Sequence, residues 1–341
     1  MKKLAMLTIL IFCINSILFA DVTEKKKLVV SLKKFGTYTS DTESSYSGEK
    51  KLEKSDGLFE GKGFFGKMVQ AFFPSGKKGE IFKLDEKNVY NLSYDSATYY
   101  VTPIEKLFEE EDADDDAEVN DNDDANEEAR FKTLREEFKV IDLKEKGEFN
   151  QFKIKNYRIL MLNETLEIAT QIIRTDSLIV NLSMTDEGDF IKANNEKMAF
   201  NKKYFELIGT EFNDEYEHML GLSWINIVKK NDENNGASSA DSKKAISELE
   251  KLKGYPVVID GHYYTRKIDP NAPKAEKPKM SGGFGGMFNK IAKSVAANVV
   301  SDEGRNYVEQ LSYYIETTSL GFDTLAKDSF EVPGNFVQTS N

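Results

Sequence analysis

Between residues 82 and 102, apolar and polar side chains alternate, as is typical of half-buried β-strands. Tyr90, Leu92 and Tyr94 fall on one face of such a strand, with polar residues between them. Polar turn segments separate this stretch from its neighbours, and Pro103 ends the last strand. The pattern therefore predicts a meander of three strands joined by short hairpin turns.

Other segments have the same character, and in residues 178–184 the apolar side chains of every second residue share one face. Residues 157–162 are apolar on both faces, which predicts a strand that is covered on both sides. The further expected strands are residues 27–32, 50–60, 139–143, 149–154, 157–162, 169–174, 178–184, 257–264 and 307–318.

The spacing of apolar residues along the chain changes after residue 200. Apolar residues recur at every fourth position, which predicts a helical stripe that packs on the sheet. Gly209 and Gly221 weaken this helix, so we expect a break into two helices. A shorter helix is expected over residues 242–253 and should end at Gly254. The residues of the stripe are Tyr204, Ile208, Phe212, Tyr216, Leu220, Trp224 and Val228.

This order of strands, helices and strands predicts an α+β fold that is mainly antiparallel β. We expect a curved or incompletely closed β-barrel with helices covering one face. Residues 267–283 contain several prolines and glycines, and they are expected to form an extended linker.

The formal net charge is −12, and much of it comes from one segment, because residues 109–128 hold 13 acidic and no basic residues. Such a run repels itself, so residues 104–130 are predicted to be a disordered, solvated insertion. Calcium binding is an alternative, since Asp112, Asp114 and Asp116 alternate, but Ala117 stands where the calcium loop of an EF-hand needs glycine. The acidic balance also argues against a nucleic-acid partner.

Residues 1–20 are predicted to be a signal peptide, because Lys2 and Lys3 precede an apolar stretch that ends at Ala20. The protein would then be exported to the periplasm, the cell envelope or the medium. A retained membrane anchor is one alternative. Lipidation at Cys13 is another, although Phe12 replaces the small residue that a lipoprotein signal has before its cysteine.

The sequence offers little catalytic chemistry. With 2 His and 1 Cys, cysteine catalysis, disulfides and zinc clusters are nearly excluded. Neither His218 nor His262 has a nucleophile at a recognisable spacing, and common hydrolase and phosphate-binding motifs do not occur. We therefore expect no enzyme, no cofactor and no metal site, with a hydrolase of unrecognised site as an alternative.

Two separate segments, residues 61–73 and 282–300, begin with glycines and aromatic residues and continue as amphipathic helices. Because Phe and Met adapt to irregular apolar partners, these helices are candidates for covering a ligand cleft or touching lipid. The alternative is that they are ordinary capping helices of the core. The candidate ligand-binding residues are Phe64, Phe65, Met68, Val69, Phe72, Phe284, Met287, Phe288 and Ile291.

Residues 82–90, 252–260 and 328–336, together with the expected signal peptide, resemble exported bacterial domains of unknown function. Those domains are similar in outline to the LolA/LolB lipoprotein carriers. The resemblance implies a single LolA-like β domain over residues 21–341, with an unclosed barrel, a helical lid and an apolar cavity. It also implies non-covalent binding of acyl chains, with no catalytic residues to carry over. This chain is longer and contains the acidic insertion.

The sequence therefore predicts an exported, non-enzymatic binding protein that holds an apolar or lipid-like ligand in the cleft of a half-open barrel. Its partners would be lipid or lipoprotein acyl chains, or an envelope protein. The alternative is a structural or interaction protein of the cell envelope that takes no small-molecule ligand.

Overall fold

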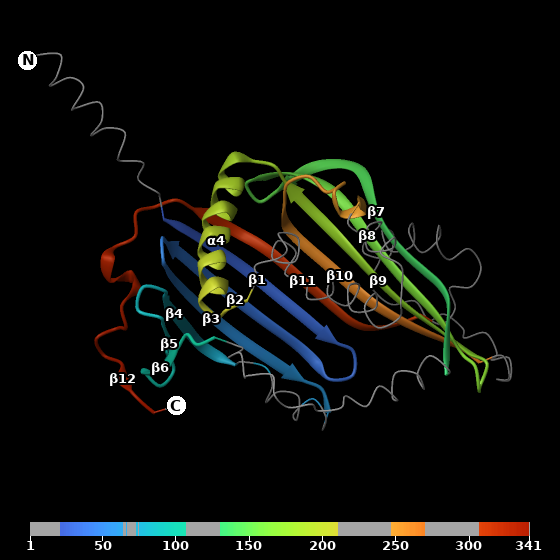
Figure 1. Cartoon of the computed structure of the whole chain (residues 1–341), viewed down its shortest axis with the longest axis horizontal. Helices are drawn as coiled ribbons and strands as arrows, with labels where there is room; N and C mark the ends of the chain where they lie inside the picture. The colour runs from blue at the N-terminus through green and yellow to red at the C-terminus, as the bar shows by residue number, and fades with distance from the viewer. Residues whose placement is uncertain are drawn as a thin grey trace, which may run out of the picture.

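The computed structural model describes residues 21–63, 66, 73, 75–106, 130–210, 247–269 and 307–340 (Figure 1). Its strands form one sheet in the order β12-β6-β5-β4-β3-β2-β1-β11-β10-β9-β8-β7. The strands are β1 (Val22–Leu32), β2 (Gly36–Ser47), β3 (Lys50–Gly61), β4 (Gly76–Lys83), β5 (Asn88–Ser93), β6 (Thr98–Pro103), β7 (Phe131–Phe149), β8 (Phe152–Glu167), β9 (Ile172–Thr185), β10 (Tyr255–Ile268), β11 (Val308–Gly321) and β12 (Val337–Gln338).

All neighbouring strands pair antiparallel except β12, which runs parallel to β6. β1 to β6 form one meander, β7 to β10 form a second, and β11 joins them by pairing with both β1 and β10. In the part of the chain that the structure describes, β7 and β12 stand at opposite edges of the sheet. The prediction of a mainly antiparallel, unclosed sheet is therefore confirmed.

The sheet curves most strongly at β7 and β8 (Figure 1). The pairing of these strands shifts register between Asp142 and Lys146, and Lys144 in this bulge has a positive φ of 60°. A β-bulge of this kind bends the strand and increases its twist. The tip of the hairpin consequently reaches β11, where the side-chain amide of Asn150 donates a hydrogen bond of 3.5 Å to the carbonyl of Thr317.

Helix α4 (Gly188–Leu207) lies across one end of this sheet (Figure 1). We call the sheet face that carries it the inner face and the opposite one the outer face. Near the start of the helix, Phe190 packs edge-on against Phe152 of β8. Near its end, Phe200 contacts the rings of Tyr46 in β2 and Phe82 in β4. A single helix thereby connects strands that lie far apart in the sheet.

The prediction of the helical stripe was wrong about where the helix begins. The helix begins at Gly188, ahead of the expected stripe, and ends at Leu207. The helix ends just before Gly209, one of the two glycines expected to interrupt it; Gly209 has a φ of 73° and its N–H donates to the carbonyl of Glu206 at 3.3 Å. A glycine in this conformation is a common helix terminator. The remainder of the stripe, residues 211–228, lies outside the described residues.

Two expected strands, residues 149–154 and 169–174, are only partly correct, because each contains a hairpin turn, at 150–151 and 168–171, and the following strands begin at 152 and 172. Asn150 and Gln171 occupy the left-handed region there, with φ values of 50° and 59°. The predicted linker over residues 267–283 also begins too early, since β10 continues to Ile268, which pairs with Ile173. Apolar side chains near the turns, such as Phe152 and Ile173, gave these segments the appearance of continuous strands.

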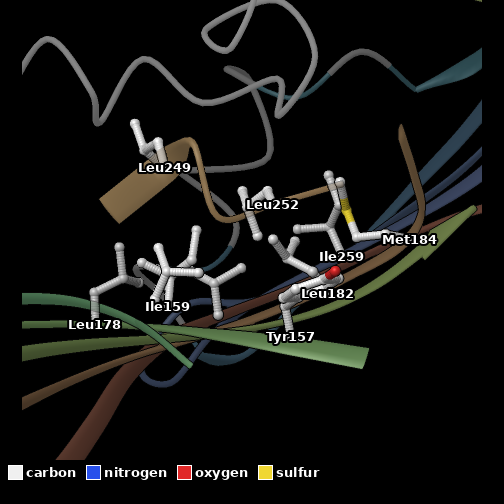
Figure 2. Close-up of a cluster of buried hydrophobic side chains, with 10 residues drawn as sticks. Tyr157, Ile159, Leu178, Leu182, Met184, Leu249, Leu252 and Ile259 are labelled. Atoms are coloured by element: carbon white, nitrogen blue, oxygen red, sulfur yellow. The ribbon is translucent and has the colours of Figure 1, made fainter. Parts of the chain in front are cut away.

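The largest group of buried apolar side chains lies on the inner face over β7 to β10 (Figure 2). Leu178, Leu182 and Met184 share one face of β9, as the alternation predicted. Leu249 and Leu252, from the segment before β10, pack onto this cluster. The predicted helix over residues 242–253 is helical at 247–249, within the described residues, and the chain turns at Gly254 with a φ of 89°.

A second cluster lies on the outer face over β3 to β6. Leu52, Ile81 and Leu92 are covered there by Phe330, which belongs to the short 3-10 helix η2 (Lys327–Phe330). The chain after β11 thus closes over the outer face before β12 joins the sheet edge. The expected signal peptide at residues 1–20 and nearly all of the expected acidic insertion lie outside the described residues.

Candidate functional site

The candidate ligand-binding residues predicted from the sequence lie outside the described residues, so the structure does not test them. They are Phe64, Phe65, Met68, Val69, Phe72, Phe284, Met287, Phe288 and Ile291. Phe73, which follows the first group, is described, and its ring stacks on Phe59 of β3 at 4.7 Å between centroids. The ring of Phe73 also lies 5.1 Å from that of Tyr38 in β2, so this end of the segment rests on the inner face.

The start of that segment is held by a close backbone approach. The carbonyl of Phe35 accepts a hydrogen bond of 2.7 Å from the N–H of Lys62, and a Cβ at Gly66 would lie 2.4 Å from the same oxygen. A Cβ at Gly61 would lie 2.8 Å from the backbone of Gly66. The glycines at 61 and 66 therefore let two chain segments touch at the end of the β1–β2 hairpin.

The inner face is apolar over its central strands. The cross-strand registers place Val30 of β1, Tyr313 of β11 and Val180 of β9 on this one face. Several of its apolar side chains are only partly buried, in contrast to the fully buried cluster over β8 and β9. The partly buried members are Leu28, Val30, Leu311, Tyr313, Ile315, Tyr263, Met161 and Phe138.

At the end of the inner face, beneath α4, the side chains are charged instead of apolar. The carboxylate of Glu24 in β1 is 2% exposed, and both of its oxygens accept hydrogen bonds from the Nζ of Lys197, at 3.0 and 3.1 Å. The Nζ of Lys26 lies 3.1 Å from one of these oxygens, and the hydroxyl of Thr317 donates to the other at 3.4 Å. One buried carboxylate thus faces two ammonium groups.

This arrangement shifts both pKa values in the pair. Burial alone would raise the pKa of Glu24, but the charges and hydrogen bonds of Lys26 and Lys197 outweigh it and lower that pKa to about 2. Burial, with the positive charges of Lys26 and Lys51, lowers the pKa of Lys197 to about 8 despite the attraction of Glu24. The carboxylate of Glu24 is therefore ionised. The negative charge of Glu24 does not fully offset the effect of burial and of the neighbouring lysines on the ammonium of Lys197.

The charged group lines a cavity of about 110 Å³ between α4 and the sheet. The Nδ2 of Asn194 is buried in its wall with no hydrogen-bond partner in the described part of the chain. Burial of an amide donor without a partner is unfavourable, so this atom marks a place where a polar ligand or water is expected. The lining residues are Glu24, Lys26, Tyr46, Phe190, Asn194, Lys197, Met198, Asn201, Tyr255 and Pro256.

A second hollow, of about 400 Å³, lies on the outer face between β3 to β5 and the segment 328–334. Leu52, Ile81 and Leu92 form its floor, and Pro333 is part of the covering segment. The segment is anchored by Lys83, whose Nζ lies 2.8 Å from a carboxylate oxygen of Glu331. This hollow is thus a partly open gap between the sheet and the C-terminal segment that covers it.

His262 provides the nearest approach to a catalytic arrangement, because it lies opposite Ser312 in the sheet. Its Nε2 lies 3.0 Å from Asp260 and its Nδ1 lies 3.4 Å from Glu309. The hydrogen bond to Asp260, helped by Glu309, raises the pKa of His262. The ring of His262 thus lies between the carboxylates of Asp260 and Glu309.

In the described residues, no group of three or more His, Cys, Asp or Glu side chains is placed to hold a metal ion. Among the same residues, no helix combines the length and apolar character needed to cross a membrane. Comparison of the chain with protein-family models, curated proteins and solved structures finds no match.

Sequence reasoning missed the charged cavity altogether. Glu24 stands in a strand next to three lysines, where it looks like one more surface charge, and Lys197 lies 173 residues further on. The available signal was weak: Asn194 and Lys197 are one turn apart and share a helix face with the apolar Phe190.

Proposed function

We propose that this chain is a non-enzymatic binding protein that holds an apolar or lipid-like ligand against the inner face of its unclosed sheet. The observation that carries the proposal is the row of apolar, partly buried side chains on that face, from β7 to β1. Removal of a ligand methylene from water onto such a surface contributes about 0.8 kcal/mol. An acyl chain can therefore be bound without specialised residue types.

The position of α4 supports the proposal, because a helix that crosses one end of the inner face leaves the remainder of that face for other covers. The two glycine-led segments, 61–73 and 282–300, would serve as those covers, so that helices close one face of the sheet. Phe73 contributes support, since it already lies on Tyr38 and Phe59.

The similarity in outline to LolA/LolB carriers points to the same function, with acyl chains of lipids or lipoproteins as the ligand class. Export through the signal peptide at residues 1–20 would place the protein in the periplasm or cell envelope, where such ligands occur. In this proposal residues 21–341 act as one LolA-like domain.

A matched pair of substitutions in β1 tests the proposal. Val30 lies on the inner face and Val29 on the outer face, and both are partly buried. Val30→Asp should weaken the binding of 1-decanol, measured by calorimetric titration, at least tenfold, because it places a charge on the ligand surface. Val29→Asp should leave the affinity within twofold. Equal effects of the two variants, after confirmation that both remain folded, would count against an inner-face site.

The acidic residues 109–128 allow an experiment that distinguishes this function from the alternative of an envelope interaction protein. Deletion of residues 109–128 should leave the affinity for decanol unchanged if the inner face binds the ligand. An interaction protein that depends on these charges would instead lose its partner, and high salt would mimic that loss.

A further inference from the structure

We infer that the cavity beneath α4 binds the acidic group of an anionic amphiphile whose apolar part lies along the inner face. This inference rests on the proposed function for the apolar part of the ligand, and it adds the ligand's charge class.

The charge balance of the cavity favours an anion. Lys26 and Lys197 contribute two positive charges to the lining and Glu24 contributes one negative charge. Among the neighbouring groups, Lys51 is already paired with Glu53, with 2.7 Å between its Nζ and the carboxylate. A bound carboxylate or phosphate would therefore neutralise an excess that the protein itself leaves in place.

The hydrogen-bonding groups agree with the charge. The Nδ2 of Asn194 is a buried donor without a partner in the described residues, and it lies one helical turn before Lys197. Both oxygens of Glu24 are already occupied by lysine ammonium groups, so the carboxylate is not available to a cation. The cavity group that lacks a hydrogen-bond partner in the described residues is thus a donor, which suits an anionic oxygen.

The size and place of the cavity set the kind of ligand. A volume of about 110 Å³ corresponds to roughly three or four water molecules at ~30 Å³ each, which is enough for a carboxylate or phosphate group and too little for an acyl chain. Glu24 and Leu28 share the inner face of β1, and four residues of strand span about 13 Å. An acidic group held by Lys26 and Asn194 in this cavity would place its chain along the apolar strands.

The test compares ligands with one apolar chain and different head groups, by calorimetric titration of the purified protein. Decanoate should bind at least tenfold more tightly than 1-decanol, and decyltrimethylammonium should bind more weakly than 1-decanol. Equal affinity for decanoate and decanol would overturn the inference while leaving the apolar site intact. If none of the three binds, the proposed function itself fails.

Two substitutions locate the effect, and a neighbouring lysine provides the control. Lys26→Met and Asn194→Leu should each weaken decanoate binding about tenfold, the size expected for a lost hydrogen bond to a charged group, without change for decanol. Lys25→Met should leave both affinities unchanged, because Lys25 lies on the outer face and pairs with Glu43. An unchanged decanoate affinity in Lys26→Met would contradict the inference.

The last part of the test is competition by small anions that have no apolar chain. Acetate and inorganic phosphate should compete with decanoate only at concentrations at least a hundredfold higher, because they lack the apolar chain. If inorganic phosphate alone binds as tightly as decanoate, the cavity is a site for a small free anion and the link to an amphiphile is wrong.

Discussion

The Nζ of Lys197 in helix α4 lies 3.0 and 3.1 Å from the two carboxylate oxygens of Glu24 in strand β1, with Glu24 buried and Lys197 largely buried between helix and sheet. This contact ties α4 to the middle of the sheet. Its energetic role differs from that of a surface ion pair, because removal of one partner leaves the other charged and out of water.

Glu24→Gln should therefore lower the free energy of unfolding by about 3–5 kcal/mol, measured by urea denaturation at neutral pH. The double variant Glu24→Gln with Lys197→Met should recover a large part of this loss, since the stranded charge is removed as well. A single variant that costs less than about 1 kcal/mol, the range of exposed pairs, would show that the pair is solvated.

The pH dependence of this contribution follows from the lowered pKa of Glu24. The pKa is about 2 in the folded protein against 4.5 for the free side chain, so the unfolded chain takes up the proton first as pH falls. The stabilisation is fully present above pH 4.5 and is lost between 4.5 and 2, with a total of roughly 3 kcal/mol. The difference in unfolding free energy between wild type and Glu24→Gln should shrink over that interval, and a constant difference would contradict the assignment.

Lys197 should titrate far below an ordinary lysine. Burial and the neighbouring lysines lower its pKa to about 8, so the side-chain ¹³Cε resonance should move with a midpoint near pH 8. Because this folded-state pKa lies below the unfolded value of 10.5, the contribution of Lys197 to stability rises as pH increases from 8 to 10.5. Bound decanoate should move the midpoint upward, since an anion stabilises the ammonium. A midpoint near 10.5 without ligand would refute the buried environment.

Phe200 anchors the end of α4. It is 3% exposed and its ring makes edge contacts with Tyr46 and Phe82. Phe200→Ala should cost about 3–5 kcal/mol in unfolding free energy. Ile191→Ala on the exposed side of the same helix should change stability by ~0.5 kcal/mol or less. Chemical denaturation of both variants checks this difference, and similar losses would argue against packing of α4 on the sheet.

Gly254 and Gly188 provide a second matched pair. A Cβ at Gly254 would lie 2.1 Å from the carbonyl oxygen of Thr185, and its φ of 89° suits only glycine, whereas Gly188 has open space around it. Gly254→Ala should destabilise the protein by at least ~1–3 kcal/mol, and Gly188→Ala should be neutral or stabilising by up to ~1 kcal/mol. Thermal unfolding distinguishes the two, and a stable Gly254→Ala variant would be inconsistent with this turn.

The meander over residues 82–102 could be predicted because its side chains alternate between a more buried apolar face and a less buried polar face, as Leu92 and Asn91 show. β2 could not be predicted in this way. Its sequence is dominated by Ser, Thr, Asp and Glu, and it is a strand because β1 and β3 pair with it on both sides. Ser40, Ser44 and Ser45 are buried as a result.

α4 escaped prediction for a related reason. The face that it turns to the sheet carries Asn194 and Lys197 beside Phe190 and Phe200, so the apolar period is interrupted where the helix covers Glu24. The pairing of Glu24 with Lys197 joins residues 173 positions apart and becomes visible only when the sheet has brought them together. A local pattern therefore located the apolar strands and missed the charged end of the same face.

The most direct test of a ligand on the inner face is native mass spectrometry of the protein purified without detergent, followed by extraction of the released molecule. The account predicts a stoichiometric adduct that is extracted into organic solvent, carries an acidic group, and is depleted in Val30→Asp but retained in Val29→Asp. A protein that carries no adduct from a lipid-containing lysate, and takes up neither decanoate nor decanol afterwards, would contradict the account.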